Sequence, residues 1–260
     1  MDYSFNSYSF NELKEFLDSK VEEFNNHDFL PEDPLGIVHE FTLKQDREIM
    51  GILLSTIAWG NRKSILKSGR RLIDIFGGNP FGFIQNHTEK DFENVHFVHR
   101  TFQVSDLQFF CQGLQEIYKK YSSLESVFKP HDEYTGAKGR IVNFRETMLT
   151  FPHEKRSEKH LANPLKKSAS KRINMFLRWM VREDDKQIDF GIWKSIPMNE
   201  LMIPLDVHTS TVGRKLGLIT RKQDDWSALE ELMVNLRKFD DKDPCKYDFA
   251  LFGLGVSKTN

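Results

Sequence analysis

Apolar residues recur along most of this 260-residue chain at the three- and four-residue spacing of amphipathic helices. Ser9 and Glu12 form a capping-box pattern before the first run, and the stretch from Gln45 to Trp59 is apolar nearly all round, as in a buried helix. Strand-like alternation is scarce. Helices are expected at about 13–24, 45–59, 62–76, 105–121, 140–150, 171–181, 225–239 and 244–254 and directly after Asp206, with short helical pieces at 80–95 and a loop at 29–36.

This pattern predicts an all-α fold of about ten helices, in which helices next to each other in the chain pack as pairs. No run approaches the ~18 apolar residues that are needed to span a bilayer. The N-terminal segment also lacks the basic stretch and apolar run of a secretory leader. We therefore expect a cytoplasmic protein with no membrane partner.

The composition leaves the predicted fold unchanged and adds two basic segments. Cys111 and Cys245 are the two cysteines, which excludes a disulfide framework and any all-cysteine, four-ligand metal site within the chain. The formal net charge is -1, so binding to nucleic acid must come from regional patches. Two segments are basic, and the second is interpreted either as a mobile, solvated linker or as a contact surface. The basic residues are Arg62, Lys63, Lys67, Arg70 and Arg71 in the first and Lys155, Arg156, Lys159, Lys166 and Lys167 in the second.

Two residues at expected helix starts are candidates for chemistry. Asp206 follows an apolar stretch, and its carboxylate is expected to cap the next helix by accepting from the Thr209 amide. His208 lies two residues further on. Lys171 begins a strongly apolar helix, where the helix dipole and partial burial favour a neutral, nucleophilic amine. For each residue a simpler interpretation stands beside this one: a plain helix cap for Asp206 and a surface lysine for Lys171.

Four segments, in the same order along the chain, resemble DNA glycosylases of the helix-hairpin-helix superfamily, of the endonuclease III and adenine glycosylase type. The stretch from Leu205 to Leu218 resembles the motif V-D-T-H-V-x-R-V-x-x-R-L-G-L, and Ser168 to Leu177 resembles the hairpin and helix G-V-G-x-K-T-A-x-x-x-L. Ile52 to Phe76 resembles an early helix pair that opens with L-L-S-x-Q, and Tyr247 to Gly255 resembles the closing helix D-Q-A-L-M-D-L-G. The chain as a whole resembles a bacterial family distantly allied to these enzymes, and its long gap from Lys171 to Asp206 is similar to that of archaeal 8-oxoguanine DNA glycosylases.

The resemblance implies a fold of two helical lobes with a cleft between them, lobe A at about 1–40 plus 205–260 and lobe B at about 41–204. It implies that double-stranded DNA is the partner and that a modified base is flipped out of the duplex. Lys171 would attack the sugar to give a Schiff base, with strand cleavage by elimination, and Asp206 would assist. The DNA phosphate would be held by Lys166, Lys167, Ser168, Ala169, Ser170 and Arg172. The base pocket would be formed by Met175, Asp248 and Phe252.

The chain departs from the superfamily pattern at several positions. Lys167 and Ala169 replace the hairpin glycines, which let a backbone approach a phosphate closely. Ile57 and Thr211 stand where the superfamily has a glutamine and an arginine. No cysteines follow Gly255 to hold the iron–sulfur cluster of endonuclease III, so no cofactor is expected.

The sequence therefore favours a DNA glycosylase with associated lyase activity on an oxidised or otherwise modified base. Two alternatives remain open. One is a non-catalytic nucleic-acid-binding protein on the same scaffold, and the other is a helical enzyme that acts on a small nucleobase or nucleoside. For the pocket residues, the alternatives are a core position for Phe252 and a solvated helix position for Asp248.

Overall fold

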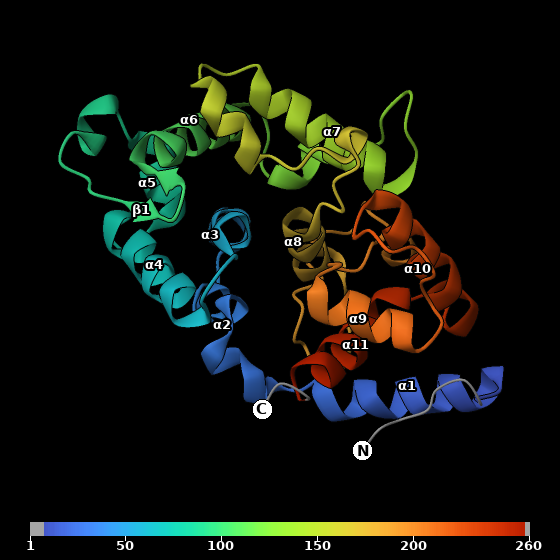
Figure 1. Ribbon diagram of the computed structural model, residues 1–260. Helices are drawn as coiled ribbons and strands as arrows, with labels where there is room; N and C mark the ends of the chain where they lie inside the picture. The colour runs from blue at the N-terminus through green and yellow to red at the C-terminus, as the bar shows by residue number, and fades with distance from the viewer. Residues whose placement is uncertain (1–7, 258–260) are drawn as a thin grey trace. The chain divides into compact units, whose positions relative to one another are not determined.

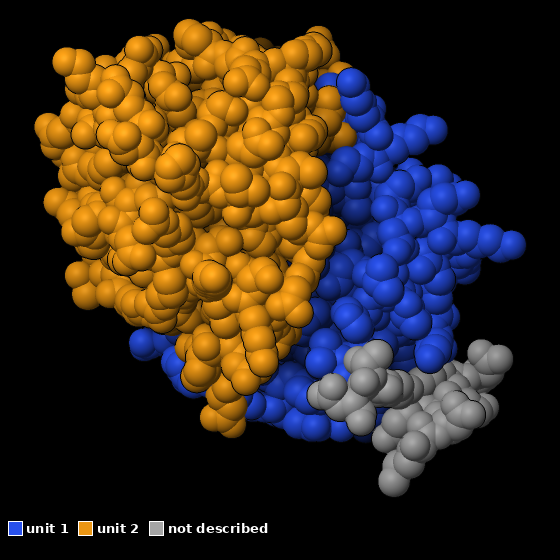
Figure 2. Space-filling view, turned by 60° about the vertical axis from the view of Figure 1, so that its left-hand side comes forward, with its two compact units in different colours: residues 1–27, 164–260 blue, residues 28–163 orange. Residues whose placement is uncertain are grey.

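The computed structural model describes residues 8–257 and confirms an all-α fold. Its described part contains eleven α-helices and one antiparallel pair of two-residue strands, and it divides into two compact units (Figures 1 and 2). Unit 1 combines residues 1–27 with 164–260, and unit 2 is residues 28–163. These boundaries differ from the expected lobes, because 164–204 lie with the C-terminal helices and 28–40 with unit 2. Residues 1–7 and 258–260, the ends of the expected lobe A, lie outside the described residues.

Unit 1 is organised around its last helix, α11 (Tyr247–Val256). This helix packs against both α1 (Phe10–Phe24) and α9 (Val207–Lys215). Two glycines permit the close approach: a Cβ on Gly253 would lie 2.4 Å from the Phe24 ring, and one on Gly255 would lie 2.6 Å from the His208 Cβ. The unit also contains α8 (Lys171–Val181), α10 (Trp226–Phe239) and the short helices η6 (Pro164–Lys166), η7 (Met198–Glu200) and η8 (Pro244–Lys246).

Unit 2 surrounds the helix α3 (Lys44–Ile57), whose residues from Glu48 to Ile57 are all buried, as the apolar pattern predicts. Glu48, the buried carboxylate of α3, accepts hydrogen bonds from Tyr118, from Ser123 and from the Leu124 amide. The other elements are η2 (His27–Glu32), α2 (Pro34–His39), α4 (Arg62–Ile75), α5 (Pro80–Asn86), η3 (Glu89–Phe92), β1 (Val98–His99), β2 (Phe102–Gln103), α6 (Val104–Lys120), η4 (Leu124–Val127), α7 (Gly136–Leu149) and η5 (Lys155–His160).

The expected loop at 29–36 is wrong, because η2 (His27–Glu32) covers its first part and α2 begins at Pro34. Its two prolines suggested a loop, yet Pro34 occupies the first turn of the helix, where its missing N–H costs no hydrogen bond. The Asp33 carboxylate caps this turn by accepting from the Leu35 amide. The β1–β2 hairpin was also not expected, because two-residue strands are too short to give an alternating pattern.

The basic stretch expected at 151–170 divides between the two units, and its part in unit 2, residues 151–163, is held by hydrogen bonds and ion pairs. Asp106, buried at the start of α6, accepts hydrogen bonds from Arg156 Nη1 at 2.8 Å and from Ser157 Oγ at 2.6 Å. Arg145 of α7 donates to the carbonyls of Glu158 and Leu161. These contacts hold η5 on both sides, so Arg156 has a structural partner. None of the described helices is long and apolar enough to cross a membrane.

We expect Asp106→Asn to lower the free energy of unfolding by about 2–4 kcal/mol. The substitution removes the buried negative charge that pairs with Arg156 and accepts the hydrogen bond from Ser157. Urea titration measures this value. Trypsin should also cut faster within 151–163. Glu40→Gln, which removes an exposed partner of Arg70 in the same unit, is the control and should change stability by less than about 0.5 kcal/mol. Equal effects of the two substitutions would refute the role of Asp106.

Candidate active site

Lys171 is the first residue of α8, and a tight turn of the chain brings it there. Lys167 and Ser170, on either side of this turn, both have left-handed backbone, with φ of 63° and 54°. The turn is held to the start of α10, since the Trp226 amide donates to the Lys167 carbonyl at 3.1 Å and Ser168 forms a β-bridge with Asp225. The N-terminus of α8 therefore has a fixed position within unit 1.

Asp206 is the N-cap of α9, as the sequence predicts, and its two carboxylate oxygens have different partners. Oδ1 accepts a hydrogen bond from the Thr209 amide at 2.9 Å. Oδ2 lies 3.1 Å from the Lys171 Nζ. The capping contact therefore fixes the orientation in which the carboxylate meets the lysine, and the two candidates, 35 residues apart in the sequence, form one ion pair.

This ion pair is open to solvent on the lysine side. The Lys171 side chain is 38% exposed and that of Asp206 is 12% exposed. A pair with one exposed partner contributes little to stability, because water screens the charges and the lysine loses rotamer freedom. The arrangement is better suited to chemistry, since it holds a solvent-accessible amine beside a carboxylate of fixed orientation.

Helix α11 supports α9, the helix that Asp206 caps, through two contacts. The Phe252 ring packs edge-on against the His208 ring with centroids 5.8 Å apart, and Gly255 lies against the His208 Cβ. His208 is two residues from Asp206, so α11 holds the start of α9 in place. Phe252 is half-buried, which makes it neither a full core residue nor a free surface residue.

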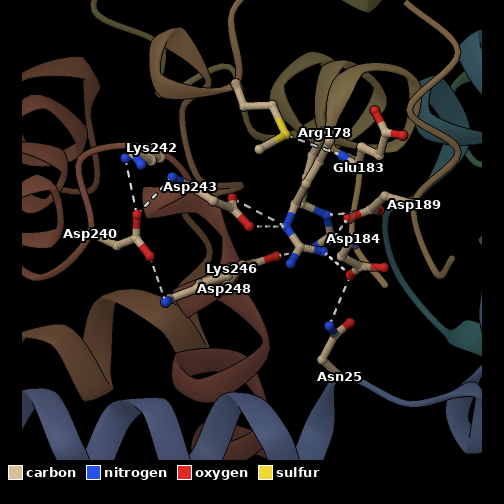
Figure 3. Close-up of polar contacts among 12 residues, drawn as sticks. Asn25, Arg178, Glu183, Asp184, Asp189, Asp240, Lys242, Asp243, Lys246 and Asp248 are labelled. Atoms are coloured by element: carbon tan, nitrogen blue, oxygen red, sulfur yellow. Dashed lines mark hydrogen bonds and ion pairs between the residues drawn. The ribbon is translucent and has the colours of Figure 1, made fainter. Parts of the chain in front are cut away.

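A buried network of charges links α11 to α8 (Figure 3). Arg178 of α8 donates to Asp248 of α11 and, through Nε at 3.2 Å, to Asp189. Its guanidinium also lies over the Phe249 ring, 4.6 Å from the centroid. Asp248 is therefore buried and paired, and the solvated position that was its simpler interpretation is wrong.

A second arginine, the C-cap residue Arg182 directly after α8, completes the network. Arg182 Nε donates to Asp243 at 2.9 Å, and its Nη1 donates to Asp184 at 2.5 Å and to Asp189 at 3.1 Å. Burial lowers the pKa of Arg182, but the surrounding carboxylates outweigh it and raise the pKa above its ordinary value. The Asn25 amide donates to Asp184, which ties the end of α1 to the same cluster.

The network contains four carboxylates and only two guanidiniums, and a buried carboxylate whose charge is not fully compensated has a raised pKa. Burial raises the pKa of Asp248 to about 7, Arg178 opposes this, and the charge of Asp206 adds to it. Lys171 also lowers the pKa of Asp248. The proposed pocket residue and the Lys171–Asp206 pair are therefore electrostatically coupled.

The other residues expected at a DNA phosphate occupy both exposed and buried positions. Lys166, Lys167 and Ser168 are exposed, whereas Ala169 and Ser170 are buried in the turn. Arg172 is half-buried, and burial lowers the pKa of its guanidinium. Met175, expected in the base pocket, is half-buried one turn after Lys171.

Sequence reasoning missed the arginines of the network, although the chain holds a signal for them. Lys171, Met175 and Arg178 lie at spacings of four and three residues, which places them on one face of α8, and Arg182 follows as its C-cap. Charged residues on a face of an otherwise apolar helix need buried partners. No three His, Cys, Asp or Glu side chains within residues 8–257 are grouped as metal ligands.

A family model described as "Protein of unknown function (DUF2400)" matches residues 33–257. This match covers most of the chain and both units, so the protein belongs to that family. Neither a curated protein nor a solved structure matches the chain.

We expect Asp248→Asn to gain stability relative to the wild type as pH rises from 5 to 8. A carboxyl whose pKa is raised by folding stabilises the protein below its unfolded pKa, near 4, and this contribution is lost as pH approaches 7. Neutral Asp and Asn resemble each other at low pH, so the two proteins should differ least there. At pH 8 the relative gain should reach at most about 4 kcal/mol.

Thermal unfolding of both proteins across this pH range measures the difference. Asp241→Asn, at an exposed position of the same unit, is the control and should change stability by less than about 0.5 kcal/mol. A constant difference between wild type and Asp248→Asn would mean that Asp248 does not titrate in this range.

Proposed function

We propose that this protein is a DNA glycosylase with associated lyase activity, which acts on an oxidised or otherwise modified base. One observation carries the proposal: the Lys171 Nζ lies 3.1 Å from the Asp206 Oδ2, although 35 residues separate them. A protein that only binds nucleic acid has no need for an amine and a carboxylate that converge on one point. The pairing is the one that the resemblance to helix-hairpin-helix glycosylases implies.

The proposed reaction begins when Lys171 gives up a proton, with Asp206 as the nearest acceptor. The amine lone pair then attacks the C1′ of the deoxyribose, the glycosidic bond breaks, and its electron pair leaves with the base, which takes up a proton. Asp206 passes the proton that it took from Lys171 to the departing base, and as a carboxylate again it stabilises the positive charge that develops on the sugar. Opening of the sugar ring gives an imine on Lys171, from which elimination cleaves the strand.

Residues beside the pair support this assignment. The backbone turn of Ser168 to Lys171 at the start of α8 is suited to an anion, and exposed Lys166 and Lys167 add positive charge. Lys167 has φ of 63°, a conformation that glycine adopts freely, and it occupies the place of a hairpin glycine in the resembling enzymes. The backbone at this position of the present chain is therefore one in which a glycine would fit without strain.

In this proposal Met175, Phe252 and Asp248 line the place of the flipped base. The Phe252 ring and the Met175 thioether are both half-buried, so each has a surface that a base can cover. Asp248 has a pKa of about 7 and is therefore present both as acceptor and as donor near neutral pH. Arg178 holds this carboxyl at a fixed position for either role.

We expect the wild type to form a covalent adduct when it is incubated with duplex DNA that carries 8-oxoguanine, uracil or an abasic site and then treated with borohydride. Borohydride reduces the imine to a stable amine linkage, which gel electrophoresis detects. Lys171→Arg keeps a positive charge beside Asp206 but has no nucleophilic amine, so it should give no adduct. Lys238→Ala, at an exposed lysine of α10, should give the wild-type yield.

Each outcome separates the proposal from its alternatives. Binding of duplex without any adduct in the wild type would favour the non-catalytic binding protein. Absence of both DNA binding and adduct would favour an enzyme acting on a small nucleobase or nucleoside. An unchanged adduct in Lys171→Arg would exclude Lys171 as the nucleophile.

We expect Asp206→Asn to separate the capping role of this residue from its catalytic role. Asparagine also caps helices, so the hydrogen bond from Thr209 is kept and the free energy of unfolding should change by less than about 1 kcal/mol. The rate of adduct formation should fall roughly 10²-fold or more, because the charge beside the amine is lost. Asp206→Ala should lower both stability and rate. A normal rate in Asp206→Asn would leave Asp206 with capping alone.

A further inference from the structure

A second positively charged surface lies on unit 2 and belongs to none of the residues proposed above. From Arg62 to Ile73 the chain has five basic residues and no acidic one. All five are exposed on α4, and only Arg70 has an acidic partner, Glu40, among the described residues. We define the α4 basic face as the surface formed by Arg62, Lys63, Lys67 and Arg71 together with Arg100.

Arg100 joins this face through the β1–β2 hairpin. His99, the residue before it, bonds Ser68 of α4 through Nδ1 at 2.9 Å and the Trp59 carbonyl through Nε2 at 3.2 Å. The Arg100 guanidinium lies over the Trp59 ring, 4.9 Å from its centroid. Gly60 leaves room for it, since a Cβ there would lie 2.3 Å from Arg100 Nη1. The guanidinium is therefore held in place without a carboxylate partner among residues 8–257.

We propose that the α4 basic face binds the phosphate backbone of duplex DNA, as a contact surface separate from the Lys171–Asp206 site. From Arg62 to Arg71 a helix rises about 14 Å, which is close to the width of the DNA major groove. Exposed lysines and arginines along such a length can neutralise phosphates of the duplex backbone. Arg100, stacked and fork-shaped, suits a phosphate in particular.

The same helix is poorly suited to a membrane surface. A helix that lies on a bilayer must insert its apolar face, but the apolar face of α4 is buried within unit 2. Gly69 lies so close to its neighbours that a Cβ would be 2.7 Å from both Ile37 Cδ1 and Leu54 Cδ2. The exposed side therefore offers charge to a partner, and a polyanion fits it better than lipid does.

The test uses the full chain and undamaged duplex DNA, with fluorescence anisotropy measured over a range of salt concentrations. The triple variant Lys63→Gln, Lys67→Gln, Arg71→Gln should reduce the slope of log K against log salt by about two to three and weaken binding roughly tenfold or more at low salt. The control triple variant Lys90→Gln, Lys120→Gln, Lys129→Gln removes the same net charge from exposed positions of unit 2. It should keep the wild-type slope.

Trp59 gives a second measurement. Trp179, Trp193 and Trp226 are buried, whereas Trp59 is half-buried, so DNA that covers Arg100 should change the emission of Trp59. The change should vanish in Trp59→Phe and shrink in Arg100→Gln. Equal slopes in the two triple variants, or binding of anionic phosphatidylserine vesicles that is lost only in the first triple variant, would overturn the proposal.

This inference rests on the proposed function for its partner, but the two fail separately. A wild-type borohydride adduct with an unchanged salt slope in the α4 variant would remove the second surface and keep the reaction. A reduced slope in the α4 variant without any adduct in the wild type would keep the surface and remove the reaction.

Discussion

The burial of two guanidiniums, those of Arg178 in α8 and of its C-cap Arg182, is the constraint on which unit 1 depends. Taking a charged group out of water costs several kcal/mol unless opposite charges and hydrogen bonds surround it. Arg178 and Arg182 meet this requirement with carboxylates from three separate segments: the loop after α8, the turn before η8 and α11 itself. The charges therefore specify which segments must meet.

This constraint also determines the geometry of the candidate site. Lys171 and Arg178 share one face of α8 and Arg182 is its C-cap, so the contacts that hold the arginines also set the rotation of the helix that carries the lysine. Helix α11 contacts Arg178 through Asp248 and contacts α9 through Phe252. The charge network that supports the pair is thus buried, and the pair is open to solvent on the lysine side. A buried charge network that supports a partly exposed ion pair can hold an amine in a fixed position and leave it accessible to solvent.

Both proposed nucleic-acid contacts arise from local charge rather than from the chain as a whole. The formal net charge of -1 produces no overall attraction to a polyanion. The basic residues of the 151–163 stretch are partly used inside unit 2, as Arg156 shows by its bond to Asp106, whereas those of α4 face solvent. Whether a basic segment can bind a polyanion therefore depends on the partners that its side chains have in the folded protein. A count of basic residues in the sequence does not distinguish the two segments.

The sequence by itself determined the helical class, the start of α8 and the capping role of Asp206, because apolar spacing and helix caps are local properties of a few neighbouring residues. The short α2 and the β1–β2 hairpin were missed because their local signals are weak or opposed by prolines. Only the tertiary structure decided that Asp206 meets Lys171 and that Asp248 is buried with Arg178. These contacts join residues 35 and 70 positions apart, and such pairing depends on how whole helices pack around the buried charges.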